Sequence, residues 1–178
     1  KRLLHRKRNQ VYSQIQTQTK PNRRYQESNL VSSILNRNFT IGGKMIKIAH
    51  ISDTHIRNLK YHYEYKMAFK DMYKKLRKMS PDIIVHTGDL AHTKTQLSPE
   101  FFQMCSSFLH NLGEIAPTYI ILGNHDGNLK NNTRQDAITP IVEALQHSNL
   151  HLLKNSGEIE PIPGLTLNVL SVFDRDQW

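Results

Sequence analysis

The sequence has one cysteine, one tryptophan and no long hydrophobic run. Because Cys105 is alone, no disulfide forms within the chain, and its place among apolar residues at helical spacing favours a buried structural thiol over a nucleophile. A lone thiol fits a reducing intracellular compartment, whether cytoplasm, nucleoid or nucleus. No stretch reaches the roughly 18 apolar residues that a membrane-spanning helix needs, so we expect no membrane partner.

Acidic residues are scarce in the first quarter of the chain. The whole sequence has 24 basic and 15 acidic residues, a net charge of +9. Ten of the basic residues but only one acid, Glu27, precede Met45, so the remaining 14 basic residues are balanced by 14 acids. We expect residues 1–44 to form a basic flexible extension. Its composition favours a solvated segment over one that contacts phosphates through counterion release.

From residue 46 onward the hydrophobic pattern becomes regular. Strands are predicted at 46–51, 83–85 and 118–122, with helices at 62–79 and 98–112 between them and another near 137–147. Strands are also predicted at 150–153 and 165–172, on either side of a turn-rich segment at 155–164. The alternation predicts an α/β fold with a parallel βαβαβ core, whose strands send their carboxyl ends to one edge. Ligands bind at that edge in open α/β sheets.

Each of the first three predicted strands is followed by polar groups that a core does not need. These segments are Ser52-Asp53-Thr54-His55, Gly88-Asp89-Leu90-Ala91-His92 and Gly123-Asn124-His125-Asp126. Singly, they can be explained as turn residues and surface imidazoles. Their joint occurrence at three parallel strand ends favours a metal site instead.

The types of these side chains indicate the chemistry. Asp, His and Asn together suit Mn²⁺, Fe²⁺ or Zn²⁺. Asp53 and His55 are two residues apart and point to the same side if the strand stays extended. A central carboxylate such as Asp89 bridges two cations, which clamp a phosphate and activate a water. We expect His125, held by Asp126, to protonate the leaving oxygen.

Asp-x-His, then Gly-Asp, then Gly-Asn-His-Asp, resembles the calcineurin-like metallophosphoesterase superfamily over residues 46–147, continuing to about 172. Within it, Gly-Asp-Leu-Ala-His followed by Ser98-Pro99 is similar to the SbcD-type double-strand-break repair nucleases and the small subunit of the phage recombination endonuclease. The resemblance implies roles for six side chains. Asp53 and His55 would hold the first metal, Asp89 would bridge, Asn124 would hold the second, His125 would serve the leaving group, and His92 would orient a DNA phosphate. His92 alternatively caps the helix entry.

The resemblance also implies a function and partners. It predicts a DNA repair or recombination nuclease that uses two divalent ions, Mn²⁺ foremost, with an SMC-type coiled-coil ATPase subunit, and it allows a homodimer. The alternatives are a small-molecule phosphodiesterase or phosphatase of the same superfamily, and a non-catalytic scaffold on the same fold.

One departure from the family pattern affects the predicted activity. The family closes its site with a later lone histidine and a Gly-His-x-His pair, and neither occurs in this sequence. We therefore expect residues 45–178 to be the N-terminal part of a catalytic domain, a partial metallophosphoesterase sandwich whose C-terminal half is missing. Such a piece is predicted to bind metal weakly and to be inactive alone.

Overall fold

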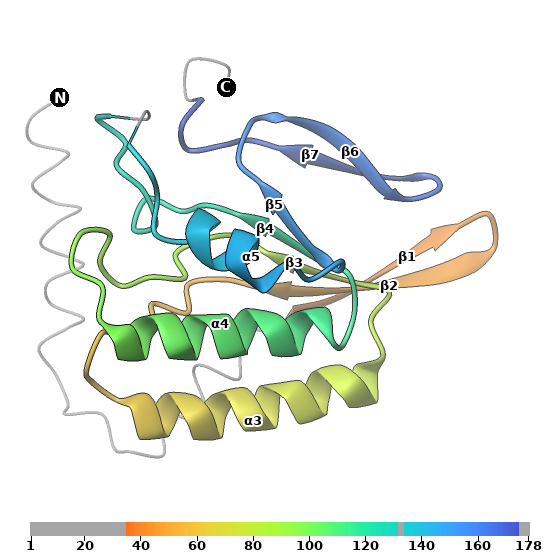
Figure 1. Cartoon of the computed structure of the whole chain (residues 1–178). Coiled ribbons are helices and arrows are strands. Elements are labelled where there is room, and N and C mark those ends of the chain that lie inside the picture. The colour runs from red at the N-terminus through yellow and green to blue at the C-terminus, as the bar shows by residue number, and fades with distance from the viewer. Residues whose placement is uncertain (1–34, 132–133, 175–178) are drawn as a thin grey trace, which may run out of the picture.

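The structure, a computed structural model, describes residues 35–131 and 134–174. Five strands form one sheet in the order β1-β2-β3-β4-β5 (Figure 1). They are β1 (Leu35–Ile41), β2 (Lys44–Ile51), β3 (Ile83–His86), β4 (Thr118–Ile121) and β5 (Leu150–Leu153). β1 pairs with β2 in the antiparallel sense, and β2 to β5 are mutually parallel. The predicted α/β class with a parallel core is confirmed.

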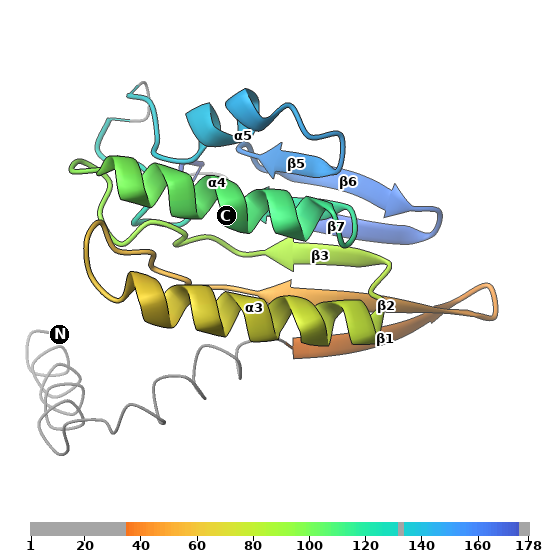
Figure 2. The same cartoon turned by 60° about the horizontal axis from the view of Figure 1, so that its bottom comes forward.

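Two long helices lie side by side on one face of the sheet, and both were predicted (Figures 1 and 2). α3 (His62–Met79) ends where Ser80 turns into the left-handed region before Pro81. α4 (Pro99–Gly113) begins at Ser98, whose hydroxyl accepts a hydrogen bond from the backbone N–H of Phe101 at 3.2 Å. A short helix, α5 (Thr139–Leu145), follows β4. None of the helices in the described ranges is both long and apolar enough to cross a bilayer.

The sheet is buried on both faces, as expected for parallel strands. The larger core lies between the sheet and the helices and includes Ile84, Phe101 and Phe108, each fully buried. A smaller cluster on the other face joins Ile46, Ile48 and Ile83 to Leu165 of a hairpin formed by β6 (Gly157–Ile162) and β7 (Leu165–Val169). The parallel strands are thus packed between the helices on one face and the β6–β7 hairpin on the other. This packing holds in place the sheet edge from which the loops emerge.

Two predictions about local structure are wrong. Residues 35–44 do not belong to a flexible extension, because β1 forms a hairpin with β2 through Gly42-Gly43. Residues 155–164 are not only a turn, because β6 occupies most of that range. The rest of the predicted extension, residues 1–34, lies outside the described residues.

Candidate metal centre

The loops after β2 and β3 are tied together by backbone hydrogen bonds beyond the ends of the strands. The N–H of Asp53 donates to the carbonyl of Gly88 at 3.1 Å, and the N–H of His55 donates to the carbonyl of Asp89 at 2.9 Å. An isolated parallel bridge then joins Ile56 to Ala91. The two loops therefore continue the parallel pairing of their strands, and they bring the first two motifs to one edge.

Asp53 and His55 come together by a different route from the predicted one. β2 has already ended at Ile51, and both residues have positive φ angles, 54° and 43°, as does Asp89 at 54°. Such left-handed conformations are strained for residues other than glycine, and they persist only where surrounding contacts hold them. The interloop hydrogen bonds provide that restraint. The extended backbone assumed for this pair is wrong, although the two side chains do face each other.

The His55 ring lies between two carboxylates. Its Nε2 is 3.7 Å from Oδ1 of Asp53 and 3.8 Å from Oδ2 of Asp89. These separations are too long for hydrogen bonds. They approach the spacing of about 3.4 Å between atoms that share a tetrahedral ion at bonds of about 2.1 Å. The other ring nitrogen, Nδ1, is buried without a hydrogen-bond partner among the described residues. One imidazole nitrogen facing two carboxylates is a donor set that suits a divalent ion, so the residues fit a metal beside Nε2.

Asp89 connects the second and third motifs. Its Oδ1 accepts a hydrogen bond from the backbone N–H of His125 at 2.8 Å, while Oδ2 faces His55. Asp89 is only 15% exposed, whereas Asp53 is 66% exposed. The central carboxylate is thus held in place by the protein, with Oδ2 left toward the site.

The glycines before Asp89 and Asn124 allow the two loops to touch. Gly88 has a φ of +93°, and a Cβ built on it would lie 2.4 Å from the backbone nitrogen of Gly123. A Cβ built on Gly123 would lie 2.1 Å from Oδ1 of Asp89. Gly88 therefore serves a sharp turn, whereas Gly123 is required for the close approach of the two loops and has no unusual φ.

Three imidazoles gather at this edge. The ring centroid of His125 is 4.8 Å from that of His55, and the His92 ring is 5.9 Å from His55 and 6.2 Å from His125. Nδ1 of His125 lies 3.0 Å from the backbone carbonyl of His92, so it donates there and leaves Nε2 free to accept a proton or a metal. Ligand atoms of His55, Asp89 and His125 all lie within 4.8 Å of one another.

Asp126 does not hold His125, which corrects the predicted role. Its carboxylate is fully buried and accepts hydrogen bonds from the backbone N–H groups of Ala91 at 2.8 Å and Gly123 at 2.9 Å. Burial is the main cause that raises its pKa to about 6. Asp126 is therefore a brace between the second and third loops, and the ring of His125 is oriented by the His92 carbonyl instead.

Asn124 is exposed at the same edge, next to His125, and its backbone carbonyl accepts a hydrogen bond from Lys94 at 3.3 Å. Two cationic side chains near the site were not among the predicted residues. Lys94 ties the third loop to the second, and the charge of Arg57 adds to burial in lowering the pKa of His92. In the sequence, Arg57 follows His55 by two residues, which indicates that it lies near the site. No comparable signal marks Lys94.

A protein family and two viral proteins match this chain in sequence. Residues 46–177 match the calcineurin-like phosphoesterase family, Metallophos. The chain is 44% identical over 133 residues to Uncharacterized protein R555 of Acanthamoeba polyphaga mimivirus, a match covering 72% of this chain and 10% of that protein. It is 26% identical over 107 residues to Putative phosphoesterase 244L of Invertebrate iridescent virus 6, covering 54% and 38% of the two chains.

The chain therefore belongs to the calcineurin-like phosphoesterase family. It spans about a tenth of the mimivirus protein and less than two fifths of the iridescent virus protein. Among solved structures, the Pseudomonas putida nuclease MPE is similar, with a TM-score of 0.45 and 14% identity over 71% of this chain and 64% of that chain.

A histidine outside this cluster allows a test of the buried sheet. His86 in β3 is fully buried, its Nδ1 accepts from the N–H of Gly88 at 3.3 Å, and burial is the main cause that lowers its pKa to about 3. Between pH 6.5 and about pH 3, His86 is protonated in the unfolded state but neutral in the folded state. The folded state therefore loses stability as the pH falls through this range.

We expect the metal-free chain to lose about 2 kcal/mol more stability than His86→Leu when the pH drops from about 7 to about 5. Leucine is close in size and does not titrate, so the difference isolates the imidazole. Urea unfolding at the two pH values measures it. Parallel losses in the two proteins would show that His86 is not the group responsible.

Proposed function

We propose that this chain contributes the metal-binding loops of a phosphodiester hydrolase that acts on DNA. The observation that carries the proposal is the convergence of His55, Asp89 and His125, whose ligand atoms lie within 4.8 Å of one another. Asp53 stands 3.7 Å from His55 at the same place. Three strand ends deliver these polar groups to one point, which a packed core does not require.

The roles of the side chains follow from their contacts. Asp53 and His55 would hold a first ion, Asp89 would share it with a second, and Asn124 would bind the second. When bound, two divalent ions supply charge for the phosphate and a water of lowered pKa. His125 is fixed through Nδ1 by the His92 carbonyl, so Nε2 is left to donate or accept a proton at the leaving oxygen.

The number of donors limits what this chain does by itself. Four protein ligands for two ions leave several coordination positions open, since a structural or catalytic zinc alone takes three or four protein ligands. We propose that further ligands, including the histidines of the family pattern, come from outside the described residues. The 178-residue chain is then expected to bind Mn²⁺ weakly and to be inactive, and the full-length protein to be active.

The proposal of a nuclease, rather than a general phosphatase, rests on His92. Its ring lies 5.9 Å from that of His55 and 6.2 Å from that of His125, so it borders the cluster of candidate ligands. Gly-Asp-Leu-Ala-His thus supplies a third imidazole at the site, and the resemblance to the SbcD-type nucleases implies that it would orient a DNA phosphate. An SMC-type ATPase partner, a homodimer and an intracellular setting are parts of the same proposal.

The test is cleavage of a DNA hairpin by the full-length protein with Mn²⁺. We expect cleavage that is abolished by chelation, and a loss of about a hundredfold or more in His125→Ala, which removes the proton donor. Asp89→Asn, which keeps the shape of the side chain, is expected to lose metal and activity together. Calorimetry with Mn²⁺ on each protein separates loss of binding from loss of chemistry.

Two outcomes would contradict the proposal in different ways. Cleavage of mononucleotides or aryl phosphates but not of DNA would replace the nuclease by a small-molecule phosphodiesterase or phosphatase. Absence of Mn²⁺ uptake by the full-length protein would replace the enzyme by a scaffold on the same fold.

A further inference from the structure

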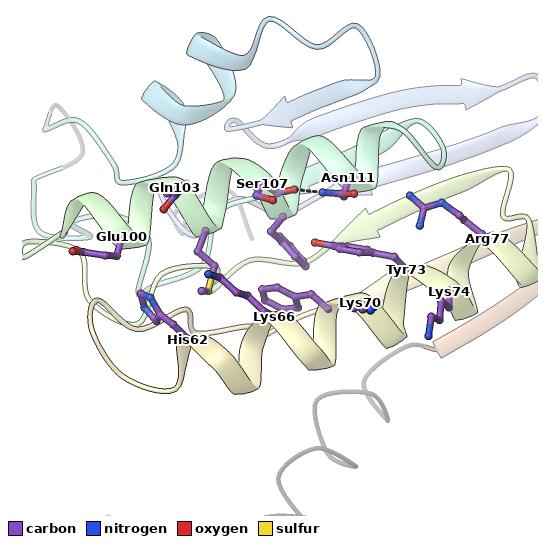
Figure 3. Close-up of a pocket in the computed structure, with 13 residues that line it drawn as sticks. His62, Lys66, Lys70, Tyr73, Lys74, Arg77, Glu100, Gln103, Ser107 and Asn111 are labelled. Carbon is purple, nitrogen blue, oxygen red and sulfur yellow. Dashed lines mark hydrogen bonds between the residues drawn. The ribbon is translucent and has the colours of Figure 1, made fainter.

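A groove of about 650 Å³ lies between α3 and α4. Figure 3 shows Lys66 on one side of it and Gln103, Ser107 and Asn111 on the other. Both helices begin at the sheet edge that carries the metal centre, so the groove starts beside that edge and runs away from it along the helical layer (Figure 1). It shares no residue with the metal site.

The α3 wall of the groove carries four cations, namely Lys66, Lys70, Lys74 and Arg77. They follow one another at intervals of four, four and three residues, which is about 6, 6 and 4.5 Å along the helix axis. In the described part of the chain, Lys74 is the one member with a carboxylate within 4 Å, Asp71 at 3.7 Å, and that pair is exposed. An exposed pair of this kind contributes little, so the wall keeps a positive field.

The opposite wall and the floor define what the groove recognises. Gln103, Ser107 and Asn111 of α4 are uncharged hydrogen-bonding side chains, and Glu100 is the single acid in the lining. The floor includes Phe69, which is 4% exposed, and Phe108, which is fully buried. Tyr73, which is half-buried, and Met104 also line the groove, so apolar surface lies beside the cations and offers bases a place to stack.

We propose that this groove binds the phosphate backbone of a single-stranded nucleic acid. Regularly spaced cations along one wall match a chain of regularly spaced anions, and neutral donors on the other wall suit sugars and base edges. Neighbouring helix axes typically lie about 8–10 Å apart, so a groove along their surface follows one strand rather than the full width of a duplex. A second copy of the chain would place two rows of lysines against each other.

The proposal extends the proposed function, because a strand leaving the metal centre would find a second contact on the same molecule. A role for the groove in positioning a substrate rests on the proposed nucleic-acid hydrolysis. Binding of a strand by the groove does not depend on that hydrolysis. The two ideas are therefore tested separately, with binding measured in EDTA, where no metal-dependent cleavage occurs.

The same helix provides a matched control. Lys75 and Lys78 are exposed on α3 but are not part of the groove. The double variant Lys66→Gln/Lys70→Gln and the control Lys75→Gln/Lys78→Gln remove the same charge from the same helix. Both replace exposed lysines with a good helix former, so neither is expected to impair folding.

Fluorescence anisotropy of a labelled oligothymidylate of about 12 nucleotides, titrated with the 178-residue chain in EDTA, measures the affinity. For two lost phosphate contacts we expect the groove variant to bind about 25-fold more weakly at about 0.1 M salt, and the slope of log K against log salt to shrink by about 1.4. The control is expected to stay within about threefold of the unmodified chain.

Three results would overturn the placement of the strand in this groove, and a fourth would separate the groove from the proposed nuclease. Equal losses in the two variants would show a general charge effect, and binding that survives both but disappears on deletion of residues 1–34 would place the strand on the N-terminal segment. Tighter binding of an acidic helical peptide than of the oligonucleotide would make the groove a protein-docking surface. Binding as expected, together with a full-length protein that cleaves no DNA, would support the groove and reject only the nuclease.

Discussion

Gly123→Ala is expected to destabilise the metal-free chain by about 3 kcal/mol or more and to abolish its Mn²⁺ uptake. The added Cβ would lie 2.1 Å from Oδ1 of Asp89 and 2.4 Å from the Asp89 backbone nitrogen. Neither atom can move freely, because Oδ1 is bonded to the N–H of His125 and the Asp89 carbonyl is bonded to His55. Relief of the clash requires the second and third loops to separate, which displaces the central ligand.

Gly113→Ala is the control for this effect. Gly113 is the last residue of α4, at the end away from the metal centre, and a Cβ there would lie 2.8 Å from the ring of His147, which is held by Glu114 and by the N–H of Asn149. We expect a loss of about 1–2 kcal/mol from displacing that ring, with unchanged Mn²⁺ uptake. Urea unfolding gives both stabilities and calorimetry gives the metal affinity. If Gly123→Ala were as mild as the control, the loop contact would not be tight.

The predictable part of the site is the part that backbone topology determines. Once strands at 46–51, 83–85 and 118–122 are identified, parallel pairing places the motifs that follow them at one edge. The spacing of apolar residues also gave α3 its observed bounds, because one continuous buried stripe ends at Ser80 and Pro81. These features depend on short-range patterns with strong periodicity.

The two missed strands have sequences that do not look like core. β1 contains Arg37 and Asn38 and lies at the edge of the sheet, where polar residues are favoured because they discourage further pairing. β6 contains Pro161 and is one strand of a two-stranded sheet, a position that tolerates a missing donor. Their pairing is set by partners elsewhere in the chain, which a local pattern does not reveal.

The side-chain contacts at the site were the least predictable feature. Asp126 follows His125 directly, and adjacency suggested that the two interact. The backbone turn after Gly123 instead directs Asp126 into the protein and His125 outward, where a carbonyl of the second loop binds it. Likewise, Asp53 and His55 meet because left-handed residues bend the loop, not because the strand continues.

The buried position of Asp126 leads to a prediction that separates bracing from catalysis. Asp126→Ala removes the acceptor of two buried backbone N–H groups, those of Ala91 and Gly123. Each unpaired group costs about 1–3 kcal/mol, so we expect a total loss of about 3 kcal/mol in the absence of metal. Asp126→Asn keeps one acceptor but turns an NH₂ group toward the other N–H, and it should lie between alanine and the unmodified chain.

The consequence for the metal centre follows from the same contacts. Ala91 belongs to the loop that carries Asp89, and Gly123 to the loop that carries Asn124 and His125, so loss of the brace loosens ligands that Asp126 does not touch. Mn²⁺ affinity is expected to fall by about 10- to 100-fold, as for other groups that orient ligands. A variant with unchanged metal-free stability but abolished hydrolysis in the full-length protein would instead return Asp126 to the chemistry, because a brace cannot be removed without cost to folding.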